Sequence, residues 1–485
     1  MGGRAVVIVV VVVAACSGGN VTIIDGPGPD TGSGSGVDPN EGARSGSRLK
    51  LTWVNFTDGT RQWNSFYDAE RKEGCYPYPA WIDGKVYCTP DSNGSVVYTD
   101  ASCTQKVGQV YDDPSCATTP PTYLLEWRYG FCESSPAHLY LRGSQVSVAS
   151  YYTRNYDGTC GGPYTDTQEL YYQLGAEVSP TSLVEVTTSA PAASSRLGEV
   201  FWQSADGMQL PTRLHDSQLN TDCYPETFSD TAQTGICMPT TAWYASDFHD
   251  GGCTQPVVGL DHTCAAPGFA DYRPTNACGL DPPRLAQISG TAPSSPLYYW
   301  SGTSCTSETA STSYTYYALG ADVSAAQVTR VYDAAASHRI QLVHYTTSDG
   351  LHYRDYSLYD SAKGAECYPT SLPDGTIVCL PYGGYISTYY RDSACTQAID
   401  LVEIYGETNC ATPDPPKYAR KYITPAPGSC AYNVELHQVS TPFAGTVYAN
   451  YGTCAVYNPG TNKLYSIGPA VDVNEFVTAT TSIDP

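Results

Sequence analysis

The cysteines of this chain constrain its fold more than any other feature. There are 19, an odd number that would leave one thiol over. With Cys16 set aside, the remaining 18 fall into three successive sets of six. Because disulfides persist in oxidising compartments, this arrangement predicts a protein that is exported from the cytoplasm. The residues expected in disulfides are Cys75, Cys88, Cys103, Cys116, Cys132 and Cys160; Cys223, Cys237, Cys253, Cys264, Cys278 and Cys305; and Cys367, Cys379, Cys395, Cys410, Cys430 and Cys454.

The three sets belong to an internal repeat of about 145 residues, with units expected at 48–194, 195–337 and 338–485. Each unit opens with an arginine followed ten residues later by Asp-Gly, then by Cys-Tyr-Pro and later by Cys-Thr-Gln. So many matches in the same order indicate a triplication. The openings are Arg48, Arg196 and Arg339, the Asp-Gly pairs begin at Asp58, Asp206 and Asp349, and the tripeptides begin at Cys75, Cys223 and Cys367 and at Cys103, Cys253 and Cys395.

The residue pattern predicts an all-β fold. Alternating apolar and polar residues recur, as in 49–54, whereas helical periodicity is nowhere sustained. Asp-Gly between such segments is typical of a hairpin turn. Each unit also contains a weaker internal repeat of strand, turn and cysteine. This repeat would give two modules per unit. The preferred architecture is therefore a six-bladed β-propeller with two blades per repeat, and the alternative is three separate small β-sandwich or barrel domains.

Short intervals between cysteines favour pairing in order within each unit. The first and second cysteines are 12–14 residues apart, and the third and fourth are 11–15 apart. Each loop closure would contribute about 3 kcal/mol in the chain-entropy model. Six cysteines allow 15 connectivities, so the order remains a prediction.

The N-terminal residues predict a lipoprotein signal peptide over 1–15. Arg4 precedes an apolar run over 5–15, which is too short to span a bilayer. The sequence at 13–16 resembles the bacterial lipobox, which implies acylation of Cys16, and Ser17 after it implies the outer membrane. An ordinary signal peptide is the alternative. Residues 16–47 are rich in Gly, Ser and Pro and predict a flexible tether of about 30 Å.

These features together resemble a group of uncharacterised cysteine-rich repeat lipoproteins of bacteria. The resemblance rests on the lipobox, the Gly/Ser tether, the Cys-Thr-Gln tripeptides and the closing strands at 171–178 and 316–323. It covers nearly all of the mature chain. It implies a location and an architecture but no activity and no functional residues.

The sequence offers no convincing catalytic site. Asp30 begins an Asp-Thr-Gly-Ser tetrapeptide like that of aspartic proteases, but it lies in the tether and has no second copy. Asp91 begins an acidic turn that lacks the alternating carboxylates of a calcium loop. There is no G-x-S-x-G motif, and no cysteine is left as a nucleophile. We expect no catalytic residues and no cofactor.

Three histidines lie close together in the third unit, at His338, His344 and His352. Imidazole is a common metal ligand, so a zinc or copper site is one interpretation. The other units lack histidine at these places, and no tight ligand spacing is present. The preferred interpretation is surface histidines and no metal site.

Tyrosine is unusually abundant, with 41 residues, and several occur in adjacent pairs. Neighbours in a strand point to opposite faces, so each pair is expected to place one ring inward and one outward. The outward rings could bind a ligand, although core packing is the preferred role for most. The pairs are Tyr151 and Tyr152, Tyr298 and Tyr299 with Trp300, Tyr316 and Tyr317, and Tyr389 and Tyr390.

The preferred function is a non-catalytic exported lipoprotein whose β-scaffold binds a polysaccharide or an envelope protein. It is expected to be a monomer held to the membrane by its lipid anchor, in the cell envelope. A net charge of −23 argues against a nucleic-acid partner. One alternative is a hydrolase with a site in a central propeller channel. Another is a purely structural envelope component.

Overall fold

The computed structural model describes residues 42–78, 83–91, 93–111, 120–126, 138–155, 158–166, 168–191, 196–227, 233–262, 264–274, 283–301, 304–333, 338–405, 415–423 and 433–485. The expected signal peptide, Cys16 and nearly all of the tether lie outside them. The all-β prediction is confirmed: the described residues form 37 strands and two single 3-10 turns, Pro180–Ser182 and Val473–Glu475. No helix in the described ranges is long and apolar enough to cross a membrane.

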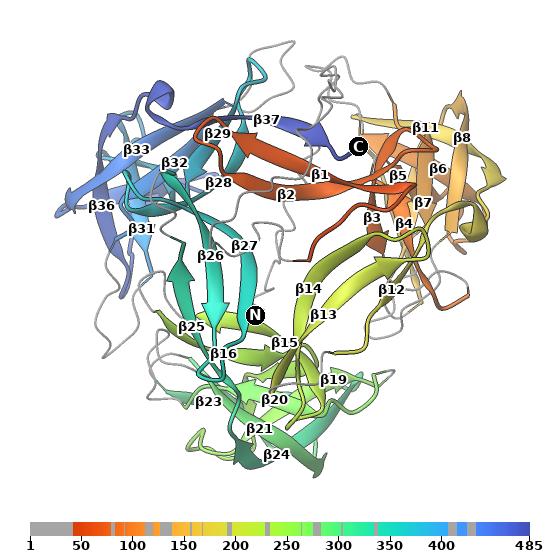
Figure 1. Cartoon of the computed structure of the whole chain (residues 1–485). Coiled ribbons are helices and arrows are strands. Elements are labelled where there is room, and N and C mark those ends of the chain that lie inside the picture. The colour runs from red at the N-terminus through yellow and green to blue at the C-terminus, as the bar shows by residue number, and fades with distance from the viewer. Residues whose placement is uncertain are drawn as a thin grey trace.

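Fifteen antiparallel strands form a closed central sheet, to which each unit contributes five (Figure 1). The first unit supplies β1 (Leu49–Phe56), β2 (Arg61–Asp68), β3 (Glu73–Tyr78), β4 (Val86–Pro90) and β12 (Glu185–Thr188). The second supplies β13 (Leu197–Ser204), β14 (Gln209–Asp216), β15 (Thr221–Thr227), β16 (Thr234–Pro239) and β25 (Gln327–Tyr332). The third supplies β26 (Ile340–Thr346), β27 (His352–Asp360), β28 (Ala365–Ser371), β29 (Ile377–Pro381) and β37 (Thr478–Ile483). Pairing of β37 with β1 closes the sheet.

Each unit also carries an outer barrel, inserted between its fourth and fifth central strands. In the first unit five strands pair in a closed cycle, and a two-strand hairpin pairs with the first of them. The cycle is β5 (Asn93–Tyr98), β6 (Lys106–Tyr111), β11 (Glu169–Glu177), β8 (His138–Val146) and β7 (Tyr123–Glu126), and the hairpin is β9 (Tyr151–Arg154) with β10 (Cys160–Tyr164).

The other two units repeat this order. In the second, the first strand is split into β17 (Ala242–Ala245) and β18 (Asp247–Phe248), followed by β19 (Pro256–Asp261), β20 (Phe269–Tyr272), β21 (Arg284–Thr291), the hairpin β22 (Leu297–Trp300) with β23 (Cys305–Glu308), and β24 (Tyr314–Val323). The third has β30 (Gly384–Tyr390), β31 (Ala398–Ile404), β32 (Tyr418–Ile423), β33 (Asn433–Pro442), the hairpin β34 (Val447–Asn450) with β35 (Cys454–Tyr457), and β36 (Lys463–Ala470). The three barrels lie at the corners of a triangle around the central sheet (Figure 1).

The propeller interpretation is not confirmed. A propeller would give each unit two four-stranded blades, whereas five of the strands in each unit join one continuous sheet shared by all three units. The fifth of these strands follows the outer barrel in sequence, so the chain leaves the central sheet and returns to it. The outer barrels are separate small β-structures, which is nearer to the alternative expectation.

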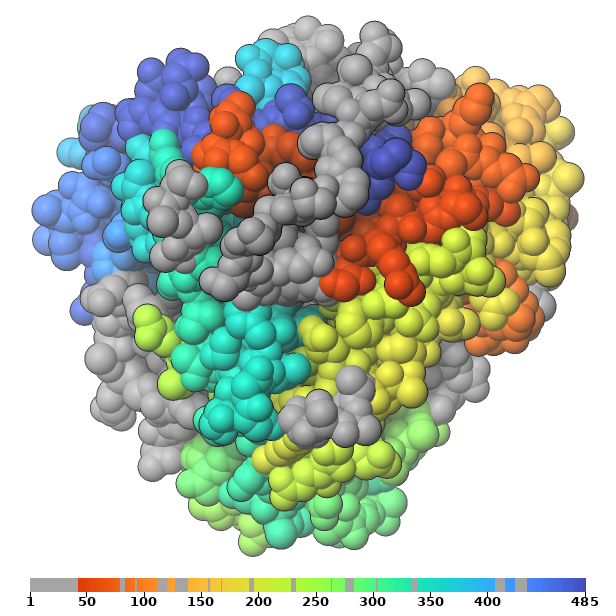
Figure 2. Space-filling view, viewed as in Figure 1, coloured from red at the N-terminus to blue at the C-terminus, as the bar shows by residue number. Residues whose placement is uncertain are grey.

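The Asp-Gly turns do more than reverse the chain, because each contacts the start of another unit. Asp206 Oδ2 accepts the backbone N–H of Leu49 at 2.7 Å, and Asp58 Oδ2 accepts that of Ile340 at 2.7 Å. Asp349 Oδ2 accepts the N–H of Arg196 at 3.3 Å. Unit two therefore contacts unit one, unit one contacts unit three, and unit three contacts unit two. Figure 2 shows atoms of neighbouring units in contact on the face of the molecule that is turned toward the viewer.

The hydrophobic cores follow the same cyclic order. Each core of the central sheet contains one disulfide of its own unit and residues from the first hairpin of another unit, so no unit completes its core alone. Met208 and Leu210 pack with Leu49, Leu51, Phe66, Cys75 and Cys88; Tyr345 and Tyr353 pack with Leu197, Leu214, Cys223 and Cys237; Val54 and Phe56 pack with Ile340, Leu358, Cys367 and Cys379.

Six disulfides are present among the described residues, and they indicate an oxidising location outside the cytoplasm. The first cysteine of each unit pairs with the second, as predicted. The prediction that the third pairs with the fourth is wrong, because the third pairs with the sixth. The bridges are Cys75–Cys88, Cys223–Cys237 and Cys367–Cys379, and Cys103–Cys160, Cys253–Cys305 and Cys395–Cys454.

The hairpin on the outer barrel explains this pairing. Because β9 pairs with β5, the start of β10 lies beside the turn that follows β5, where Cys103 is found. Cys264 is also disulfide-bonded. The remaining cysteines, Cys116, Cys132, Cys278, Cys410 and Cys430, lie outside the described residues.

Candidate functional site

The place where the three units meet is filled with side chains. Trp63 packs against Tyr356 with ring centroids 5.1 Å apart, and Arg354 donates from Nη2 to Gln62 Oε1 at 3.0 Å. The cavity left between these residues and Pro211 measures about 10 Å³. That is about the volume needed by one water molecule, so the described side chains pack closely at this point.

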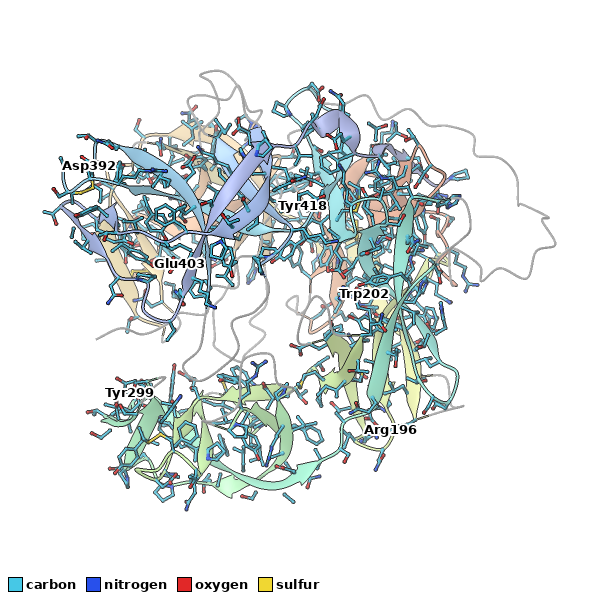
Figure 3. All side chains as sticks on the ribbon, turned by 90° about the vertical axis from the view of Figure 1, so that its left-hand side faces the viewer. Arg196, Trp202, Tyr299, Asp392, Glu403 and Tyr418 are labelled. Atoms are coloured by element: carbon cyan, nitrogen blue, oxygen red, sulfur yellow. A yellow bond between two sulfur atoms is a disulfide. The ribbon has the colours of Figure 1, made fainter. Side chains whose placement is uncertain are left out.

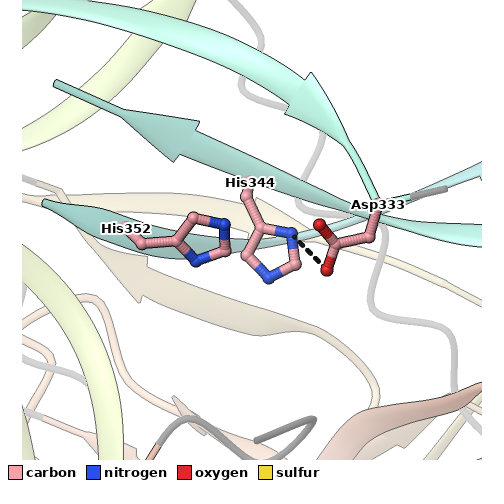
Figure 4. A group of neighbouring side chains, drawn as sticks. All are labelled: Asp333, His344 and His352. Carbon is pink, nitrogen blue, oxygen red and sulfur yellow. Dashed lines mark ion pairs between the residues drawn. The ribbon is translucent and has the colours of Figure 1, made fainter. Parts of the chain in front are cut away.

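A cluster of possible metal ligands lies where unit two meets unit three (Figure 4). Asp333 follows β25, His344 lies on β26 and His352 begins β27. His344 Nδ1 is 3.2 Å from Asp333 Oδ2, and the two imidazole centroids are 4.2 Å apart. One ligand atom from each of the three residues lies within 4.8 Å of the others.

The surface interpretation of these histidines is wrong for His344, whose side chain is 1 % exposed. The alternation of apolar and polar residues does not reveal the burial of His344, because both faces of β26 are buried where the strand enters the core of unit two. His338 does not join the cluster; its ring lies against the turn at Gly59. Asp333 was missed, although its place just after a closing strand of the central sheet is the same as that of Asp484.

The outer barrel of unit three has a hollow of about 260 Å³. Phe443, Tyr457, Asn462 and Lys463 are among the residues that line it. Glu403, on β31 of the same barrel (Figure 3), accepts hydrogen bonds from Tyr457 Oη of the β34–β35 hairpin at 2.6 Å and from Asn462 Nδ2 at 2.7 Å. Burial would raise the pKa of Glu403, but these hydrogen bonds outweigh it and lower the pKa. Burial and the hydrogen bond to Glu403 raise the pKa of Tyr457 to about 12.

Four tyrosines of unit three gather near the joint between its outer barrel and the central sheet. Tyr385 and Tyr422 stack with centroids 6.1 Å apart and are 59 % and 49 % exposed. Tyr368 and Tyr382 meet edge to face at 5.4 Å and are 36 % and 48 % exposed. Arg420 joins the pairs: it is the strand partner of Tyr385, and its guanidinium lies 5.2 Å from the ring of Tyr368.

The adjacent tyrosine pairs give a mixed result. Tyr389 is buried and Tyr390 is half-buried, as the alternation predicts. Tyr316 and Tyr317 are both buried, so the prediction is wrong for that pair. Tyr317 packs inside the barrel, while Tyr316 packs under the β22–β23 hairpin with Leu297. The hairpin covers the face that would otherwise meet solvent.

The repeated Cys-Thr-Gln tripeptide forms a structural turn. Asp100 Oδ1 accepts the backbone N–H groups of Thr104 at 2.9 Å and Gln105 at 2.6 Å, and Cys103 has a φ of 52°. Asp250 and Asp392 make the same contacts in the other units. Asp392 lies at the end of its barrel remote from the central sheet (Figure 3). These residues hold the second disulfide in place.

The acidic turn at Asp91 does not resemble a cation site. Burial, with a smaller contribution from Glu73, raises the pKa of Asp91 to about 6. Burial disfavours the charged form of this carboxylate, which is the form that a calcium ligand needs. Ser92, the next residue of the expected loop, lies outside the described residues.

Comparison with known proteins identifies the family. Residues 31–476 match the model of DUF7481, a family of unknown function. The chain belongs to the DUF7481 family. No curated protein and no solved structure matches it.

The DUF7481 match includes all three outer barrels and every central strand except β37, which begins at Thr478. The closing strand thus lies just beyond the matched range. Since no function is known for the family, DUF7481 membership transfers no site residues. The candidate sites of this DUF7481 chain rest on its own geometry.

Proposed function

We propose that the protein is a non-catalytic, lipid-anchored scaffold of the cell envelope that binds a neutral polysaccharide through the four exposed tyrosines of unit three. The observation that carries this proposal is the pair of stacked, half-exposed rings at Tyr385 and Tyr422. A tyrosine presents an apolar ring face and a hydroxyl group at its edge, which suits the apolar faces and hydroxyls of sugars.

The scaffold around these rings supports a binding role. Tyr385 and Tyr422 stand on paired strands of a closed barrel, so little side-chain entropy is lost when a ligand orders them. Arg420, which is 9 % exposed, fixes this region by donating to the backbone oxygens of Leu380 and Pro381. A net charge of −23 repels anionic chains, which is why the proposed ligand is neutral.

The experiment measures binding of the full chain to neutral polysaccharides by affinity electrophoresis. A double variant, Tyr385→Ala with Tyr422→Ala, is expected to lose at least tenfold in affinity. The matched control is Tyr405→Ala with Tyr451→Ala, which removes two rings that are 76 % and 81 % exposed elsewhere in unit three. The control is expected to bind as the wild type does.

Two results would overturn the polysaccharide proposal. One is equal binding by both double variants. The other is absence of glycan binding together with capture of an envelope protein that the Tyr385 and Tyr422 variant no longer captures, which would favour a protein ligand. The lipid anchor has its own test: incorporation of radiolabelled fatty acid is expected in the wild type and not in Cys16→Ser.

A further inference from the structure

We propose that Asp333, His344 and His352 bind one divalent transition-metal ion of the Zn²⁺ and Cu²⁺ class, which ties unit two to unit three. The inference is independent of the polysaccharide proposal, since the cluster lies in the central sheet. Asp333 belongs to unit two, and both histidines belong to unit three.

The geometry of the cluster suits such an ion. Zinc takes histidine nitrogens and carboxylate oxygens at about 2.0–2.2 Å, so two ligands of one tetrahedral ion lie about 3.4 Å apart. The Asp333 to His344 separation of 3.2 Å is already close to this. The widest separation in the group, 4.8 Å, requires a small rotation of one side chain. The two histidine rings lie with their centroids 4.2 Å apart.

Burial and charge also favour the site. His344 is 1 % exposed, whereas the Asp333 side chain is 37 % exposed, so the cluster reaches from the core to the surface. An ion there would have three protein ligands and a fourth position open to water. Arg354, the strand partner of His344, is a nearby cation, but its guanidinium donates toward Gln62 and Arg61 of unit one. The carboxylate of Asp333 offsets part of the charge of the ion.

The other two junctions between units show which residues stand at the places equivalent to the cluster. At the junction of units three and one, Arg61 lies 4.1 Å from the ring of Trp53 and forms an ion pair with Asp484. The strand registers place Asp484 and Asp333 at the same position, two residues beyond the partners of Trp53 and His344. A guanidinium therefore supplies the cation at that junction.

At the junction of units two and three, His344 replaces Trp53 and His352 replaces Arg61. Two imidazoles beside a carboxylate include no permanent cation such as a guanidinium, and all three groups are ligands for a metal cation. At the junction of units one and two the corresponding residues are Phe201 and Gln209, and Pro191 stands two residues beyond the partner of Phe201. Metal-binding residues are thus combined at one junction of the three.

The test titrates the metal-free full chain with Zn²⁺ by calorimetry and follows its thermal midpoint. The expected result is one equivalent bound and a midpoint that rises with Zn²⁺ concentration. Cu²⁺ is expected to bind more tightly than Zn²⁺, following the general order of affinities. The partly exposed ligands are changed, in Asp333→Asn and His352→Gln, because altering buried His344 could prevent folding. Each variant is expected to lose at least tenfold in Zn²⁺ affinity.

The control is His338→Gln, which alters a histidine of the same segment outside the cluster and is expected to bind as the wild type does. Unchanged Zn²⁺ affinity in both ligand variants would overturn the proposal. So would a folded wild type that binds neither Zn²⁺ nor Cu²⁺.

Discussion

Arg196 donates to both carboxylate oxygens of Asp216, from Nε at 3.0 Å to Oδ1 and from Nη2 at 2.7 Å to Oδ2. The Asp216 side chain is fully shielded from solvent, and its Oδ1 also accepts the N–H groups of Gln218 and Leu219. The same pair recurs as Arg48–Asp68 and Arg339–Asp360. The arginine that opens each unit therefore fixes the end of the first hairpin.

Replacing Arg196 by lysine should lower the free energy of unfolding by about 1.5–3 kcal/mol, the range for hydrogen bonds to charged groups. Lysine keeps the charge but cannot form the two parallel hydrogen bonds. Urea unfolding of the purified chain measures the change. The comparison is Arg284→Lys, where the exposed pair with Asp322 at 3.6 Å should contribute about 0–1 kcal/mol. Equal losses of the free energy of unfolding in the two variants would show that the shielded ion pair stabilises the fold no more than the exposed one.

The contacts between units predict that two Asp-Gly turns differ in how much they stabilise the fold. Asp206→Ala should cost about 3 kcal/mol, because Asp206 accepts the N–H groups of both Arg48 and Leu49 across two units. Asp374 begins another Asp-Gly turn, but its carboxylate accepts from Thr376 within its own turn. Asp374→Ala should therefore cost less than Asp206→Ala. Similar midpoints in chemical denaturation would contradict a role of Asp206 in joining the units.

The disulfide pairing predicts the result of peptide mapping without reduction. A proteolytic fragment containing Cys103 should be linked to one containing Cys160, and fragments with Cys253 and Cys395 should be linked to Cys305 and Cys454. Removing the 57-residue Cys103–Cys160 bridge should cost about 4 kcal/mol in the chain-entropy model, against about 3 for the 13-residue Cys75–Cys88 bridge. A link between Cys103 and Cys116 would refute the pairing.

Glu169 predicts a pH dependence of stability. Burial, with a smaller contribution from Asp166, raises its pKa from 4.5 to about 7. Between these values the folded chain holds a proton that the unfolded chain has released, so the free energy of unfolding falls as the pH rises from 4.5 through 7. Glu169→Gln should be more stable than the wild type at pH 8 and about equal to it at pH 4.5. Unfolding curves at both pH values test this, and a difference independent of pH would contradict it.

The sequence was informative about the fold where the signal is local. The alternating segments, the Asp-Gly turns and the closely spaced first and second cysteines all depend on neighbours along the chain, and each appears in the structure. Closure of the central sheet could not be read in this way, because β37 pairs with β1 more than 400 residues earlier. The pairing of Cys103 with Cys160 likewise depends on where the β9–β10 hairpin docks.

The candidate metal site shows a similar limit. His344 and His352 could be named from the sequence, because both flank the turn at Asp349. Their burial could not, since it results from the insertion of this hairpin into the core of unit two. Asp333 could have been found by aligning the ends of the units, where it matches Asp484. Tyr368 and Tyr382 lie close to Tyr385 and Tyr422 because of how the outer barrel of unit three joins the central sheet. This proximity has no sequence signature.

Pairing of β37 with both β29 and β1 has a consequence for how this protein is made. Until Thr478–Ile483 have been synthesised, the edges of β1 and β29 that β37 covers stay unpaired, and such edges are templates for aggregation. A ribosome that stalls before residue 478 would therefore release a product with two open edges.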